Sequence, residues 1–174
     1  DSHLDQAIYK AHRNEVPIIG ICGGYQMLGE RINDPFEIES GIKSVNGLGL
    51  LNVSTVISKE KVTINSKGIW QSNFLGIQLE DPILKGYEIH MGRTECISGE
   101  LSIGLLHENG EVDGYTASEG LVMGTYFHGI FDNDIFRNEL INALRKRKGL
   151  DEITDRQSFE ILKDKAYDNL AEHV

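Results

Sequence analysis

Residues 16–29 read VPIIGICGGYQMLG, and this stretch decides the fold class. Its first six residues form an apolar run without polar alternation, which is typical of a strand buried on both faces of a parallel sheet. Cys22 follows the run directly, and the two glycines after it permit a tight turn. Apolar residues then recur at helical spacing, so we predict a helix over residues 25–32. The stretch therefore predicts a strand, a sharp turn and a helix, with a cysteine at the turn.

Residues 20–24 read GICGG, which is the G-x-nucleophile-x-G order of a nucleophile elbow. Small flanking residues let the strand and the helix approach closely, and the backbone N–H after the nucleophile points into the reaction site as an oxyanion donor. We therefore predict Cys22 as a nucleophile and the N–H of Gly23 as its oxyanion donor. The alternative is a buried structural cysteine, which is common for this residue type. The glycine pair makes that interpretation the weaker one.

A thiol nucleophile needs a base, and a histidine commonly serves. The mostly apolar residues 121–127 predict a second buried strand, with His128 at its carboxyl end. In an open α/β sheet, functional residues gather beyond the carboxyl ends of the strands, where both Cys22 and His128 are expected. A histidine that merely ends a strand is the alternative. The shared position with the cysteine favours a base.

Residues 86–94 read GYEIHMGRT, a segment that is strand-like but dense in polar groups. Glu88 and His90 are therefore candidate substrate-binding residues. A strand face that is simply solvated would give the same pattern. Cys96 has no glycine turn beside it, so we interpret it as structural.

Further helices and strands are predicted around these motifs. Helices are expected at residues 4–11, from Asn133 or Asp134 onward with Phe136, Leu140 and Leu144 on one face, and from Thr154 onward. Thr154 and Gln157 fit a capping box, and the inward face of that last helix is expected to hold Phe159, Leu162, Ala166 and Leu170. Strands are expected at residues 50–57, 61–65, 87–91, 101–106 and 112–116.

Composition narrows the classes of function. The 174 residues suffice for a single domain over residues 1–174, and no apolar run is long enough to cross a bilayer. Two cysteines and the lack of a signal peptide favour a soluble cytoplasmic protein with reduced thiols. The net charge of −10 argues against binding to nucleic acid. No close pair of cysteines or histidines has zinc spacing, so no metal site is expected.

Three segments, residues 20–29, 86–94 and 124–133, resemble the C-terminal class I glutamine amidotransferase domain of the cobyric acid synthases, and the match spans most of the chain. The elbow alone fits any class I glutamine amidotransferase, whereas the YEIHMGRT and HGIFDN sequences point to this family. The resemblance implies an α/β fold with a flavodoxin-like, mostly parallel sheet and flanking helices. It also implies hydrolysis of glutamine through a Cys22 thioester, with His128 as base and then acid, and with Gly23, Gly24 and Gln26 around the oxyanion and the glutamine.

The resemblance further implies a reaction that extends beyond this chain. An upstream synthetase domain would use ATP and magnesium to amidate corrin-ring carboxylates with the ammonia, converting adenosylcobyrinic acid a,c-diamide into cobyric acid in cobalamin biosynthesis. Glutamine and the corrin would be the partners, and no cofactor is expected in this chain itself. The alternatives are the amidotransferase domain of cobyrinic acid a,c-diamide synthase, a cysteine hydrolase or peptidase of the same fold, and a non-catalytic amidotransferase-like module.

Two departures from the usual amidotransferase pattern lead to further expectations. Most triad enzymes have a glutamate two residues after the catalytic histidine, but Ile130 stands there, so we hypothesise that Asp132 or Glu119 orients His128. The chain also begins too late to include the family's first strands and the loop that gives a second oxyanion N–H. We therefore expect an N-terminally truncated domain with an exposed sheet edge through which it could self-associate.

Overall fold

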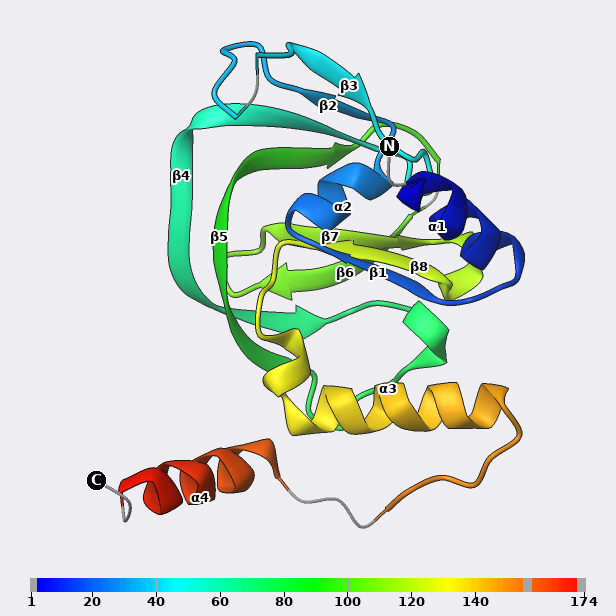
Figure 1. The fold of residues 1–174 in the computed structure, drawn as a ribbon, viewed down its shortest axis with the longest axis vertical. Coiled ribbons are helices and arrows are strands. Elements are labelled where there is room, and N and C mark those ends of the chain that lie inside the picture. Colours follow the sequence, from blue (N-terminus) through cyan, green and yellow to red (C-terminus); the bar gives the residue numbers. More distant parts are fainter. Residues whose placement is uncertain (1–2, 40, 100, 155–157, 172–174) are drawn as a thin grey trace.

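The computed structural model describes residues 3–39, 41–99, 101–154 and 158–171. In this part of the chain, one eight-stranded mixed sheet forms the centre, and helices α1, α2 and α3 lie beside it (Figure 1). The helices are α1 (Leu4–Arg13), α2 (Gly23–Leu28), α3 (Asp134–Arg147) and α4 (Phe159–Ala171), and the 3-10 turns are η1 (Phe74–Gly76), η2 (Ser118–Gly120) and η3 (Ile130–Asp132). The strands are β1 (Ile18–Ile21), β2 (Arg31–Asn33), β3 (Ser44–Asn46), β4 (Val53–Trp70), β5 (Ile83–Cys96), β6 (Ser102–His107), β7 (Val112–Ala117) and β8 (Val122–Thr125). Within these residues, no helix is long and apolar enough to span a membrane.

The α/β fold class with flanking helices is confirmed, but the expectation of a mostly parallel sheet is wrong. The strand order is β1-β8-β7-β6-β4-β2-β3, with β5 paired to β4. The pairs β1–β8 and β2–β4 are parallel, whereas the other five described pairings are antiparallel. Connections of four residues join β6 to β7 and β7 to β8, and connections this short cannot return the chain for parallel pairing.

The two strands that meet at the predicted site are neighbours, as expected. β1 pairs with β8 in parallel, with Ile21 opposite Thr125. Cys22 therefore begins its turn at the end of the sheet where β8 also ends. β8 is shorter than predicted, so His128 lies three residues beyond its end. β1 has no strand on its other side among the described residues, so it forms one edge of the sheet.

The middle of the chain is dominated by one long hairpin that was not predicted. The expected strands at residues 50–57 and 61–65 are a single strand, β4, with a shift in register between Ile57 and Val62. β5 is likewise much longer than the predicted residues 87–91. The two strands pair along most of their length and curve together around the smaller strands (Figure 1).

The helix after Cys22 ends earlier than predicted. α2 stops at Leu28, because Gly29 adopts an extended conformation. Gly29 also lies close to β4, since a β-carbon on it would stand 2.8 Å from the carbonyl oxygen of Val53. The N–H of Glu30 then donates to that same carbonyl, 2.9 Å away. Arg31 and Ile32, the last two residues of the expected helix, therefore form the start of β2 instead.

The core consists of two clusters, one that includes residues of α3 and one that includes residues of α2. The larger one lies under α3 and includes Trp70, Phe74, Leu105, Met123, Phe127 and Phe136. The smaller one lies under α2 and includes Tyr25, Leu28, Leu51, Val53, Val122 and Tyr126. Burial of these side chains supplies the main favourable term in folding.

The two C-terminal helices differ in how well they were predicted. α3 begins after Asn133 as expected and buries Phe136 and Leu140, although Leu144 is exposed and the Asn133 side chain bonds the backbone of Lys85 instead of capping the helix. The inward face predicted for the last helix is wrong, because α4 lies apart from the sheet (Figure 1) and its four predicted core residues are exposed. Gln157 of the predicted capping box lies outside the described residues.

Candidate active site

Cys22 lies on a strained strand-to-helix turn. Its backbone has φ 53° and ψ −114°, a conformation that non-glycine residues rarely adopt. Such strain costs roughly 1–3 kcal/mol and persists where the surrounding structure enforces it. A β-carbon on Gly20 would stand 2.5 Å from Leu28 and 2.7 Å from the Gly24 backbone, so strand and helix touch here. The predicted elbow is therefore present.

The surroundings of the thiol are open on one side and fixed on the other. A β-carbon on Gly23 or Gly24 would meet no atom within 4 Å, so these two residues face free space. The Cys22 N–H donates to the Thr125 carbonyl at 2.9 Å, which ties the turn to the end of β8. The thiol points to the carbonyl oxygen of Ile89 on β5, 3.5 Å from Sγ.

His128 lies against the same strand. Its N–H donates to the Tyr87 carbonyl at 2.8 Å, and the Tyr87 N–H donates back at 3.2 Å. Tyr87 and Ile89 are two residues apart on β5, which is about 6–7 Å along a strand. The structure thus brings Cys22 and His128 to neighbouring positions on β5, while their catalytic roles stay predictions.

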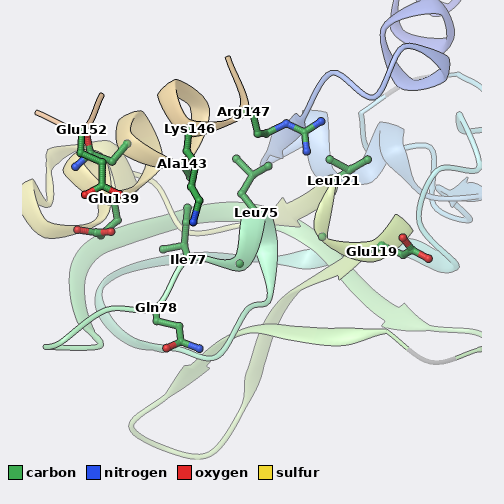
Figure 2. Close-up of a pocket in the computed structure, with 13 residues that line it drawn as sticks. Leu75, Ile77, Gln78, Glu119, Leu121, Glu139, Ala143, Lys146, Arg147 and Glu152 are labelled. Carbon is green, nitrogen blue, oxygen red and sulfur yellow. The ribbon is translucent and has the colours of Figure 1, made fainter. Parts of the chain in front are cut away.

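Glu119 is wrong as a residue that orients His128. It precedes β8, whereas His128 follows β8, so the whole strand separates them. Glu119 instead lines a cavity of about 510 Å³ beside Leu121 and the last turns of α3 (Figure 2). Asp132, the other candidate, is exposed in η3, and its proposed role stays a prediction. In the described part of the chain, the buried Nε2 of His128 has no hydrogen-bond partner.

The inward face of β5 holds the candidate residues Glu88 and His90. Nδ1 of His90 lies 2.8 Å from the Gly92 carbonyl, and its Nε2 lies 3.2 Å from a Glu88 carboxylate oxygen. Since both ring nitrogens face acceptors, the geometry fits a protonated imidazole. Burial opposes this charge, but the bonds to Glu88 and Gly92 outweigh it and raise the pKa of His90.

Glu88 also meets a second histidine, His107 of β6. Their Nε2 and Oε1 atoms are 3.3 Å apart, within ion-pair distance but outside hydrogen-bond geometry. Burial favours the neutral acid, yet hydrogen bonding to His90 and Ser66 outweighs it and lowers the pKa of Glu88. These residues line a cavity of about 570 Å³. The described residues contain no group of three or more acidic, histidine or cysteine side chains arranged to hold a metal ion.

A series of hydrogen-bonded polar side chains connects β5 to α2, the elbow helix that follows Cys22. The amide nitrogen of Gln26 donates to the hydroxyl of Tyr126 at 3.2 Å, and that hydroxyl is 2.6 Å from the hydroxyl of Thr94. The ring of His90 stacks on Tyr126 with centroids 3.9 Å apart. Asp113 accepts hydrogen bonds from the Thr125 hydroxyl and from the Tyr126 N–H, and burial raises the pKa of its carboxyl.

Sequence reasoning missed four residues of this region, namely Thr94, His107, Asp113 and Tyr126. Alternation along β5 was the signal that could have placed Thr94 on the face that holds Glu88 and His90. The other three lie on or beside strands whose pairing with that face depends on contacts distant in sequence.

The fold and this arrangement define a class of protein. A structure of PurLQS from Thermotoga maritima matches 83% of this chain and 68% of its own with a TM-score of 0.58 at 14% identity, so the two chains share a fold. The family model for the CobB/CobQ-like glutamine amidotransferase domain matches residues 1–136. The chain belongs to this CobB/CobQ-like glutamine amidotransferase family.

Two relatives are cobyric acid synthases. The one from Geobacillus sp. (strain WCH70) is 46% identical over 165 residues, which is 95% of this chain and 31% of the relative. The one from Thermoanaerobacter sp. (strain X514) is 42% identical over 178 residues, which is 98% of this chain and 35% of the relative. The chain therefore spans about a third of the length of these relatives.

Proposed function

We propose that this chain is the glutamine-hydrolysing part of a cobyric acid synthase. The observation that carries the proposal is that Cys22 and His128 both contact one stretch of β5, in a chain that matches cobyric acid synthases over nearly all its residues. In the whole protein, the ammonia would convert corrin carboxylates to amides. ATP and magnesium would act in a synthetase part outside this chain, and this chain would need no cofactor of its own.

The hydrolysis proceeds in two halves. His128 takes the thiol proton, and Sγ of Cys22 attacks the side-chain amide carbon of glutamine. The tetrahedral oxyanion accepts a hydrogen bond from the N–H of Gly23, and the C–N bond breaks as His128 returns the proton to the departing ammonia. Water then attacks the thioester with His128 again as base, which releases glutamate and restores the thiol. Gly24 and Gln26 are the remaining candidates for contact with the glutamine.

Glu88 and His90 are proposed to act at the edge of the same site. Both lie on the inward face of β5, next to the series of polar side chains that reaches Gln26. Their charges would complement the ionised amino and carboxylate groups of free glutamine. This assignment also separates the proposal from a peptidase, whose substrate lacks one or both of these charges.

Two coarser features of the protein complete the proposal. The free thiols of Cys22 and Cys96 fit the reducing cytoplasm. β1 forms an edge of the described sheet, and an edge strand offers unpaired backbone groups to a second copy. We therefore propose a cytoplasmic protein that can self-associate along β1 where nothing else covers that strand.

Labelling by a diazo-ketone analogue of glutamine tests the proposed chemistry. Cys22 is half-buried and Cys96 exposed, so an unselective reagent would favour Cys96. We expect the analogue to modify Cys22 alone, with the site found by peptide mapping, and free glutamine to protect it. Cys96→Ala should label normally and Cys22→Ala not at all. Labelling of Cys96, or none in an intact chain, would contradict a glutamine-specific thiol.

A further inference from the structure

The imidazole of His128 lies flat against the ring of Tyr87. The two ring centroids are 5.0 Å apart and the planes differ by 7°, which is an offset parallel stack. The two residues also form an isolated antiparallel bridge, with both backbone hydrogen bonds made. Their α-carbons are therefore held opposite one another before the side chains are considered.

The stack with Tyr87 restricts the imidazole, which no hydrogen bond to Nε2 holds in the described structure. Nε2 of His128 is buried, and in the described part of the chain it has no hydrogen-bond partner. Rotation of the imidazole about its Cβ–Cγ bond would drive a ring edge into the face of Tyr87. The stack therefore selects one orientation of the ring plane by steric contact.

The same strand sets the position of the thiol. The carbonyl of Ile89, two residues after Tyr87, lies 3.5 Å from Sγ of Cys22. A β-carbon on Gly86 would stand 2.2 Å from the His128 carbonyl oxygen, so the strand and the histidine backbone cannot approach more closely. β5 thus fixes the thiol through one residue and the imidazole through another.

We propose that Tyr87 is the positioning residue for His128 and takes over the orienting task that a carboxylate performs in a triad. This inference rests on the proposed glutamine hydrolysis. An orienting carboxylate holds the base in its productive geometry and stabilises the imidazolium that forms when the base takes a proton. The face of the Tyr87 ring supplies both effects more weakly, since an aromatic face attracts a cation.

Replacement of the ring tests this role. Tyr87→Leu removes the aromatic face, and since Tyr87 is 43% exposed, the variant should unfold in urea at nearly the wild-type midpoint. We expect its glutaminase kcat to fall about tenfold with little change in KM for glutamine, because the stack acts on the base and not on the substrate. Tyr87→Phe keeps the ring and should retain most of the turnover.

The matched control is Tyr167→Leu, the same change at an exposed tyrosine of α4, which should behave as wild type. Wild-type turnover in Tyr87→Leu, or equal losses in Tyr87→Leu and Tyr87→Phe, would overturn the positioning role while leaving the proposed function intact. A full chain whose wild type shows no Cys22-dependent glutaminase turnover would overturn the proposed function, and the inference with it.

Discussion

A β-carbon on Gly92 would stand 2.4 Å from the side-chain amide nitrogen of Gln26, so β5 and the elbow helix touch at this point. The same β-carbon would lie 2.7 Å from the Tyr126 hydroxyl and 2.9 Å from Thr55. Only a glycine fits among these three side chains without moving one of them. The contact joins the strand that crosses the site to the helix that follows the nucleophile.

Gly92→Ala should therefore shift Gln26 and weaken the binding of glutamine. Overpacking of this kind costs about 1–3 kcal/mol of stability, and the displaced amide should raise KM for glutamine. Urea unfolding and steady-state glutaminase kinetics measure the two effects. Gly41→Ala is the control, because a β-carbon there meets no atom within 4 Å. Equal behaviour of the two variants would show that Gln26 is not held by this contact.

The Glu88–His90 pair should make stability depend on pH. The raised pKa of His90 means that its contribution is complete below about pH 6.5 and is lost as pH rises through the folded value. The lowered pKa of Glu88 means that its contribution is present above about pH 4.3 and is lost as pH falls through the folded value. Together they stabilise the fold most between these two limits.

His90→Gln tests this pH window. The difference in free energy of unfolding between wild type and variant, measured in urea, should be larger near pH 5.5 than near pH 9. The reason is that the ion pair of His90 with Glu88 is lost as pH rises through the folded pKa of His90. A difference of the same size at both values would mean that His90 stabilises the fold by packing on Tyr126 alone.

Asp113 should be needed for stability. Its carboxylate accepts from the Tyr126 N–H at 2.9 Å and from the Thr125 hydroxyl, and the residue is only 5% exposed. Asp113→Ala leaves a buried backbone donor without its partner, which costs roughly 1–3 kcal/mol. Urea unfolding of Asp113→Ala against the exposed Asp164→Ala measures this loss. Matching unfolding midpoints would show that water replaces the carboxylate.

Glu119→Ala should leave the glutaminase activity unchanged. β8 lies between this residue and His128, and Glu119 is instead one of the residues that line the cavity beside α3 (Figure 2). Steady-state kinetics with glutamine, compared with Asp132→Ala, measures the effect of each carboxylate. A large fall in kcat for Glu119→Ala alone would contradict the separation of the two ends of β8.

The local features of this fold could be predicted from sequence, whereas its long-range pairing could not. The elbow at Cys22 follows from neighbouring residues, because strand, glycines and helix are adjacent in the chain. The approach of Glu88 to His107 depends on β4 pairing with both β5 and β6. Such pairing joins residues far apart in sequence, and local periodicity carries no information about it.

The errors have the same origin. The apolar positions of α4 predict an inward face, but periodicity reports that a helix has an apolar side and not what that side contacts. The family resemblance implies a mostly parallel sheet, and the unalternating apolar run before Cys22 agrees with it. Parallel pairing holds for β1 with β8 and for β2 with β4, and it fails for the other pairings, including β7 with β8 and the hairpin of β4 and β5.

Because side chains alternate between the two faces of β5, the site forms only when this strand pairs in one register. A slip of one residue would turn Glu88 and His90 outward and would present the side chain of Met91 or Arg93 where Gly92 now meets Gln26. The same slip would break the contacts that Cys22 and His128 make with β5. The irregularity between Ile57 and Val62 of β4, which sets how the hairpin is aligned, therefore governs chemistry at residues that it does not touch.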